Sequence, residues 1–188
     1  MKKLSSFLYT HSKGWVVGAA LVIFVVFSVL ALPGQNAIAE KYSQGSGSPD
    51  TSLFYSGGDL YAMAKWYGEE GRAAYIRARW TFDVAFPLVY TFFLATAVSW
   101  LFNKVLTTGS PWRLLNLVPI AAMLLDFLEN ISTTLVMARF PTRCPPGELL
   151  APIFTPIKWL GVGLSFLLLV AGLILVLRKA IIDKKTPG

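Results

Sequence analysis

The chain has 188 residues, of which 55% are hydrophobic and only 14% are charged, with a formal net charge of +7. Soluble domains are about one quarter charged, whereas here the charges crowd into short segments between long uncharged stretches; this excludes an ordinary soluble domain and indicates membrane spans separated by polar loops. One cysteine and one histidine exclude an internal disulfide and leave too few ligands for a zinc or haem site, so we predict no metal and no cofactor.

The first predicted span covers residues 15–32 and contains no charged residue. A signal peptide is the alternative, because Ala37–Ala39 has the small-x-small form of a cleavage site and the preceding segment is basic. The apolar run is longer than the roughly 7–15 residues of a signal peptide, which favours a retained helix. Pro33 and Gly34 are expected to end this helix.

Residues 33–81 form the longest polar segment, which we expect to be an external cap. Its portion 45–50, with the sequence GSGSPD, is typical of a flexible linker. Asp59 is then expected to N-cap a short amphipathic helix that ends at Gly68, and Glu69 begins a second helix. The segment therefore predicts a short external amphipathic helix pair between the first and second spans, with Trp and Tyr side chains at the membrane interface.

Three further apolar stretches predict the remaining spans. The second span, residues 82–102, is expected to continue the preceding helix without a break, the third covers 114–137, and the fourth covers 152–177. A rigid external loop, residues 139–150, joins the last two. Together these elements predict an all-α fold, an integral membrane four-helix bundle that forms a single transmembrane domain over residues 1–188.

The distribution of basic residues predicts the topology. They lie before the first span, between the second and third, and after the fourth: Lys2, Lys3, Lys13, Lys104, Arg113, Arg178, Lys179, Lys184 and Lys185. By the positive-inside rule, this places both termini in the cytoplasm and the protein in the cell membrane. No basic segment alternates with aromatic residues, so we expect no nucleic-acid partner; membrane lipids are the expected partners, and a membrane-protein partner or a second copy of the chain stays open.

Ionisable residues inside the third span are the main functional signal. Offsets of three, four and seven residues place Asp126, Glu129, Asn130 and Thr133 on one face of the helix. A charged residue near the bilayer centre costs about 2.5–3.5 kcal/mol on insertion scales. This face is therefore expected to point toward other helices or a wet cavity, away from lipid.

Four residues from other segments lie at a compatible depth. Asp83 is at the outer end of the second span, Tyr90 is two turns further along, and Lys158 is at the outer end of the fourth span, while Arg79 precedes the second span. We predict that these residues and the third-span face line one polar pocket in the outer leaflet. The alternative is that the same residues form buried pairs and hydrogen bonds that only fix helix packing.

Three strings carry a family resemblance: residues 68–75 (GEEGRAAY), 83–90 (DVAFPLVY) and 126–130 (DFLEN). Together they resemble a small, uncharacterised family of prokaryotic four-helix integral membrane proteins, over about residues 55–135. The resemblance implies a shared architecture and no activity.

Three functions stay open on the sequence. The first is the binding of a small amphiphile or lipid headgroup in the polar pocket. The second is a membrane enzyme that uses Asp83 and the pair Asp126–Glu129, although the dense Asp, Arg and His sets of membrane phosphatases and phosphatidyltransferases are missing. The third is a structural or accessory subunit of a membrane complex.

Overall fold

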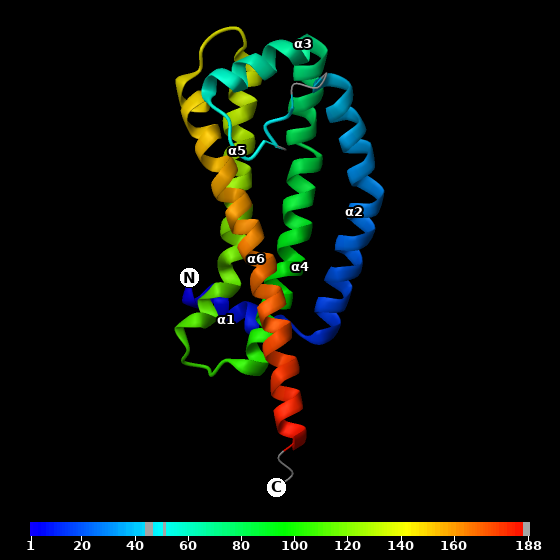
Figure 1. Ribbon diagram of the computed structural model, residues 1–188, viewed down its shortest axis with the longest axis vertical. Helices are drawn as coiled ribbons and strands as arrows, with labels where there is room; N and C mark the ends of the chain where they lie inside the picture. Colours follow the sequence, from blue (N-terminus) through cyan, green and yellow to red (C-terminus); the bar gives the residue numbers. More distant parts are fainter. Residues whose placement is uncertain (44–46, 51, 186–188) are drawn as a thin grey trace. The chain divides into compact units, whose positions relative to one another are not determined.

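All regular structure in the described part of the chain is helical. The computed structural model describes residues 1–43, 47–50 and 52–185, and these residues include helices and no strand. In chain order (Figure 1), the helices are α1 (Lys2–His11), α2 (Gly14–Ser43), α3 (Gly57–Arg79), α4 (Phe82–Val105), the 3-10 helix η1 (Pro111–Leu117), α5 (Val118–Arg139) and α6 (Pro145–Lys185). The predicted all-α class is confirmed.

Among the described residues, four helical stretches are long and apolar enough to cross a membrane. They lie in α2, in α3 with α4, in η1 with α5, and in α6. The predicted spans 82–102, 114–137 and 152–177 fall within the last three of these stretches. Only 6% of the residues in the apolar stretch of α2 are buried, and the ring of Phe27 stacks with the rings of Phe82 and Phe86.

The prediction that Pro33 and Gly34 end the first helix is wrong. Helix α2 is 30 residues long, contains Pro33, and ends at Ser43. A proline inside a helix removes one backbone hydrogen bond, but the bonds on both sides persist and can carry the helix onward. The segment Ala37–Ala39 therefore lies within the helix, and the polar connection begins after Ser43.

Helix α3 consists of two helical segments that meet at Gly68. The φ of Gly68 is 62°, in the left-handed region where a residue without Cβ is least strained. The N-cap is Ser56 instead of the predicted Asp59, which is the third helical residue and completes a capping box with Ser56. The predicted continuity with the second span is also wrong, because Trp80 and Thr81 form a turn before α4.

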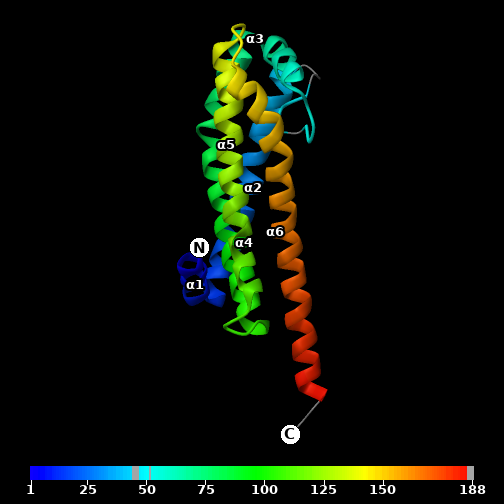
Figure 2. The ribbon, with the colours of Figure 1, turned by 90° about the vertical axis from the view of Figure 1, so that its left-hand side faces the viewer.

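Helix α6 begins earlier than predicted. It runs for 41 residues from Pro145 and is continuous in Figure 2, because proline is well tolerated in the first turn of a helix. The loop expected at 139–150 is correspondingly short. A Cβ added to Gly147 would lie 2.6 Å from the backbone oxygen of Ser132, so glycine permits this close approach of α6 to α5.

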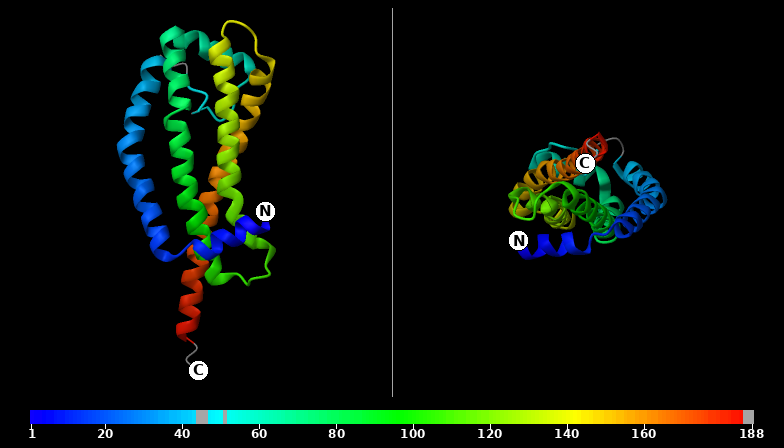
Figure 3. Two further views of the ribbon diagram at one scale, coloured as in Figure 1. Left: turned by 180° about the vertical axis from the view of Figure 1, so that it is seen from behind. Right: turned by 90° about the horizontal axis from the view of Figure 1, so that it is seen from below.

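The chain forms two compact units, and α2, α4, α5 and α6 contribute segments to each. Unit 1 contains residues 1–24, 89–121 and 161–188, and unit 2 contains residues 25–88 and 122–160. In unit 1, α1 packs against η1 (Figure 3).

Hydrogen bonds fasten α1 within unit 1. The hydroxyl of Ser5 donates to the side-chain oxygen of Asn116 over 2.8 Å, and the amide of Asn116 donates to Ser99 over 2.9 Å. The Arg113 guanidinium lies over the ring of Tyr9, 3.6 Å from its centroid. The N-terminal segment is thus an ordered helix whose polar face is bonded to the connection between α4 and α5.

The apolar core of unit 2 comes from α3, α5 and α6. It contains Leu60, Met63, Ala64, Tyr67, Tyr75, Val136, Met137, Cys144 and Ala151, all buried. Because Cys144 is buried in this core, its thiol is a packed side chain and not a surface group.

Candidate functional site

The first half of the site is centred on Lys158 of α6. Its ammonium pairs with Glu129 and lies 3.3 Å from a carboxylate oxygen of Asp126. Asp126 and Glu129 are three residues apart on α5, so both reach the same neighbour. The ammonium is also 3.9 Å from a carboxylate oxygen of Asp50. One buried lysine thus faces three carboxylates.

The second half of the site is centred on Arg79 at the end of α3. One terminal nitrogen of the guanidinium lies 2.6 Å from Asp83 at the start of α4, and the other pairs with Asp50. The turn between α3 and α4 brings Arg79 and Asp83 together. Because Asp50 faces both Arg79 and Lys158, it joins the two halves into one network of four carboxylates and two cations, which we call the ion-pair cluster.

Hydrogen bonds to both the backbone and the side chain hold Asp50 in place. The indole nitrogen of Trp159 donates to the backbone oxygen of Asp50 over 3.2 Å, and the hydroxyl of Ser48 donates to its carboxylate over 3.3 Å. Burial raises the pKa of the Asp50 carboxyl, but the Arg79 guanidinium and then the Lys158 ammonium outweigh burial and hold this pKa below its ordinary value. Asp50 is therefore ionised at neutral pH.

Hydroxyl groups extend the ion-pair cluster toward the connection before α3. Thr155 donates to a carboxylate oxygen of Glu129 over 2.6 Å, and the hydroxyl of Tyr55 lies 2.8 Å from the hydroxyl of Thr155. When Thr155 donates to Glu129, Tyr55 donates to Thr155. Burial raises the pKa of Tyr55 above its ordinary value, which keeps this phenol neutral and able to donate.

Besides Arg79, whose Nε is buried without a partner, Asn130 is a polar residue beside the cluster whose bonding is incomplete. Its side-chain nitrogen donates to the backbone oxygen of Asp83 over 3.1 Å. Its side-chain oxygen is buried and has no hydrogen-bond partner. A buried acceptor without a donor costs about 1–3 kcal/mol, so it is a position at which a donor from a ligand is favoured.

The structure brings together most of the predicted site residues. Arg79, Asp83, Asp126, Glu129, Asn130 and Lys158 meet in unit 2. Thr133 is buried on the same helix, where its hydroxyl donates to the backbone oxygens of Glu129 and Asn130. Tyr90 is also buried, but it belongs to unit 1.

Five residues that belong to the cluster or bond to its members were not predicted: Ser48, Asp50, Tyr55, Thr155 and Trp159. Asp50 was assigned to the flexible linker 45–50, of which residues 45 and 46 lie outside the described part of the structure. Residues 47–50 instead carry a buried proline, Pro49, and a charge bound by two cations. The available signal for Asp50 was that it is the single charged residue of an otherwise uncharged linker.

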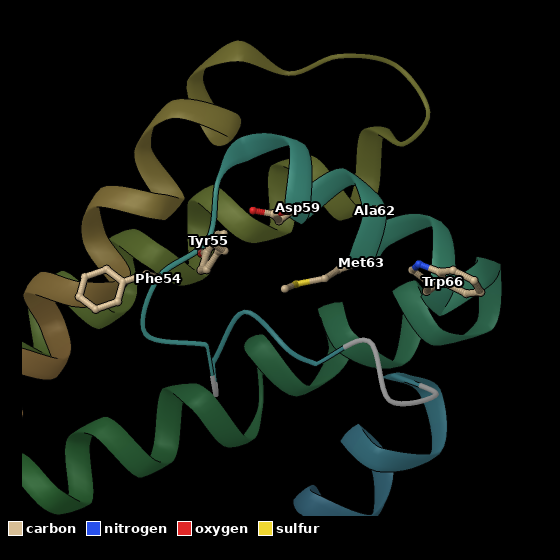
Figure 4. Close-up of a pocket in the computed structure, with 6 residues that line it drawn as sticks. All are labelled: Phe54, Tyr55, Asp59, Ala62, Met63 and Trp66. Atoms are coloured by element: carbon tan, nitrogen blue, oxygen red, sulfur yellow. The ribbon is translucent and has the colours of Figure 1, made fainter.

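A pocket adjoins the ion-pair cluster. Its volume is about 310 Å³, and it is lined by Phe54, Tyr55, Asp59, Ala62, Met63 and Trp66. In Figure 4, Phe54 and Trp66 lie at opposite ends, with Met63 between them. The ring of Tyr55 is part of the pocket wall, while its hydroxyl is bonded to Thr155 of the cluster. The pocket and the cluster therefore share one side chain.

Metal binding finds no support in the geometry of the described residues. Among them, no group of three or more His, Cys, Asp or Glu residues is arranged to hold a metal ion. In the cluster, Lys158 and Arg79 occupy the positions between the carboxylates.

Comparisons of the chain with protein-family models, with characterised proteins and with solved structures found no match. The function must therefore be argued from the chemistry of the pocket and the ion-pair cluster.

Proposed function

We propose that the chain is an integral protein of the cell membrane, with both termini in the cytoplasm and with α3 and the residues before it outside. Four helices that are long and apolar enough to cross a membrane support the first part. The lysines and arginines before α2, between α4 and α5, and at the end of α6 support the orientation. Reporter fusions at either terminus test it, and an external terminus would overturn it.

We further propose that the protein binds a small amphiphile or lipid headgroup at the end of unit 2. The observation that carries this proposal is the double role of Tyr55, whose ring lines the pocket and whose hydroxyl is bonded to Thr155 of the cluster. An amphiphile needs an apolar surface and a polar one side by side. The pocket supplies the first through Phe54, Met63 and Trp66, and the cluster supplies the second.

The size and lining of the pocket suit such a ligand. Ligand sites usually measure about 300–1,000 Å³ and combine apolar and aromatic walls with a few polar groups. At about 310 Å³ the pocket lies at the lower end of this range, and three of its six lining residues are aromatic. A short alkyl chain or one part of a longer chain fits this volume better than a large rigid molecule.

A structural role is the second candidate. It is favoured by the way Asp50, Arg79 and Lys158 tie the residues before α3 to α3, α4, α5 and α6 within unit 2. Buried ion pairs of this kind specify packing in some proteins. The two candidates differ in one respect, since a structural role does not need the pocket to be empty.

Filling the pocket distinguishes the candidates. Ala62 lines the pocket and is exposed, so Ala62→Trp adds a ring there without disturbing the core. Ala73, also exposed and on α3, does not line the pocket, so Ala73→Trp is the matched control. We measure the binding of an uncharged dansyl-labelled dodecyl amphiphile to the protein in phosphatidylcholine nanodiscs, with empty nanodiscs as the background.

Ala62→Trp is expected to reduce this binding, whereas Ala73→Trp is expected to leave it unchanged, with both proteins retaining the melting temperature of the parent. Equal binding by the parent and both variants, or no binding above that of empty nanodiscs, would contradict the amphiphile proposal and leave the structural role.

A further inference from the structure

We propose that the polar group recognised at the ion-pair cluster is a primary ammonium, the headgroup of an amphiphilic amine. This inference rests on the proposed function and names the chemical class of its ligand. Three independent features point to it: the charge of the cluster, the position of its carboxylates, and the acceptor on Asn130.

The charge of the cluster is the first feature. Its ion pairs join four carboxylates, those of Asp50, Asp83, Asp126 and Glu129, to the two cations of Arg79 and Lys158. The cluster therefore contains two more acids than bases. An uncompensated buried charge is strongly disfavoured, so the site attracts positive charge and repels an anionic headgroup.

The position of the carboxylates is the second feature. The side chains of Lys158 and Arg79 are only 7% and 8% exposed, whereas those of Asp126, Asp83 and Asp50 are 12%, 15% and 24% exposed. Glu129, at 1% exposed, is the most buried member of the cluster, and the other three carboxylates form its accessible edge. A ligand that reaches this edge meets carboxylates from α5, from α4 and from the residues before α3. The charged residue among the six that line the pocket, Asp59, is also an acid.

The third feature selects a primary ammonium from among the organic cations. The side-chain oxygen of Asn130 is buried, has no partner, and belongs to an amide only 2% exposed that is bonded to the backbone of Asp83. It is an acceptor next to the carboxylate edge. A primary ammonium has three N–H donors and can bond to this oxygen and to a carboxylate at once. A quaternary ammonium has no N–H donor and leaves the oxygen unsatisfied.

The probes are three amphiphiles with the same dodecyl chain and different headgroups: dodecylammonium, dodecyltrimethylammonium and dodecyl maltoside. Each competes with the dansyl-labelled amphiphile for the full-length protein in phosphatidylcholine nanodiscs, which already supply a large excess of quaternary ammonium. We expect dodecylammonium to compete at a concentration about tenfold lower than dodecyltrimethylammonium, a difference equivalent to about 1.4 kcal/mol. Dodecyl maltoside is expected to compete more weakly than dodecylammonium.

Two variants test which residues cause the preference for dodecylammonium over dodecyltrimethylammonium. Asn130→Leu removes the acceptor, and Asp83→Asn removes one negative charge from the edge while keeping the shape of the side chain. Both are expected to abolish the tenfold preference, which is measured in each variant as the ratio of the two competing concentrations, and the melting temperature of each variant reports that it is folded. Glu148→Gln is the matched control, because Glu148 pairs with the exposed Arg143 outside the cluster; it should keep the preference.

The outcomes separate this inference from the function on which it rests. If the labelled probe does not bind above the background of empty nanodiscs, there is nothing to compete with, and the proposed function and this inference are both overturned. If the probe binds but the three headgroups compete equally, or dodecyltrimethylammonium competes as well as dodecylammonium, the inference alone is overturned. In that case protonation of carboxylates in the cluster, and not a bound cation, compensates for the two excess acids. Free ethanolamine and phosphatidylethanolamine serve as final competitors; competition by either supports the inference and identifies the amine as soluble or lipid-borne.

Discussion

Replacing Lys158 by methionine removes one ammonium and leaves the neighbouring carboxylates without it. The three carboxylates that face Lys158 are not destabilised equally by this substitution. Asp50 keeps its pairing with Arg79, and the side chains of Asp50 and Asp126 are 24% and 12% exposed, so water can compensate for part of the loss. Glu129 is only 1% exposed and retains just the hydrogen bond from Thr155. The destabilisation should therefore come mainly from Glu129.

The size of the effect follows from this comparison. Removing one partner of a fully buried ion pair costs about 3–5 kcal/mol, because the other charge is left uncompensated. Since one of the three carboxylates is nearly inaccessible and two are partly hydrated, we expect Lys158→Met to lower the free energy of unfolding by about 3 kcal/mol. Adding Glu129→Gln should restore most of this loss, because a neutral amide still accepts the hydrogen bond from Thr155.

The measurement is equilibrium unfolding in mixed detergent micelles of the parent, the two single variants and the double variant, which form a double-mutant cycle. The matched control is Lys104→Met, because the Lys104 ammonium lies over the ring of Trp100 within unit 1, whereas the cluster belongs to unit 2. A Lys158→Met protein as stable as the control, or a loss that Glu129→Gln fails to restore, would refute the reasoning.

Three further predictions test the packing, the electrostatics and the topology. Gly147→Ala places a Cβ 2.6 Å from a backbone oxygen of α5 and should cost about 1–3 kcal/mol in the same unfolding assay, whereas Gly18→Ala, with no atom within 4 Å of the added Cβ, should cost nothing. The pKa of Asp50 is lower in the folded protein than its ordinary value of about 3.9. The ionised carboxylate therefore stabilises the fold above this ordinary pKa, and the stabilisation is lost as the pH falls through the pKa of the folded state. The stability difference between the parent and Asp50→Asn should shrink below about pH 4, and a constant difference from pH 7 to pH 3 would contradict this. A membrane-impermeant maleimide should label Thr142→Cys in intact cells when Cys144 is replaced by serine, because residue 142 is exposed and the native thiol is buried; an unlabelled Thr142→Cys protein that reacts after cell lysis would place this loop inside.

The parts of the fold and site that could be predicted are those governed by short-range regularity. Long, mostly apolar runs located the candidate spans within α4, α5 and α6, since apolar length is the main requirement for crossing a bilayer. The α5 face containing Asp126, Glu129 and Asn130 followed from the fixed offsets of a helix. The cost of charges at that depth then required partners on other helices, which led to Lys158 and Asp83.

The participation of Asp50 in the ion-pair cluster could not be predicted by the same reasoning. Asp50 lies outside any helix, so no period relates it to its neighbours, and its partners Arg79 and Lys158 are 29 and 108 residues away along the chain. The composition of its segment is typical of a flexible linker. Order there comes from bonds made only in the folded chain, from Trp159 to the backbone and from the two cations to the carboxylate.

The ends of helices were also predicted incorrectly. Pro33 was expected to stop α2, yet the helix continues to Ser43, because the single hydrogen bond lost at proline is a small part of a 30-residue helix. At α3, both Ser56 and Asp59 are suitable caps, and the sequence does not rank them. The capping box uses Ser56 at the N-cap and Asp59 three residues later.

Buried ion pairs add little net stability, which makes replacement of the ion-pair cluster informative. Apolar residues of similar volume in place of buried ion pairs are often neutral or stabilise by about 1–4 kcal/mol. Combining Asp126→Leu, Glu129→Leu and Lys158→Met removes both partners together, so no buried charge of this group is left unpaired, and the variant should unfold with at least the free energy of the parent. If the carboxylates recognise an ammonium, the same variant should lose the preference for dodecylammonium over dodecyltrimethylammonium while it still binds the uncharged probe. A variant that is stable and keeps the preference would show that these three residues serve packing, and the recognition would then have to come from Asp83 and Asp50 alone.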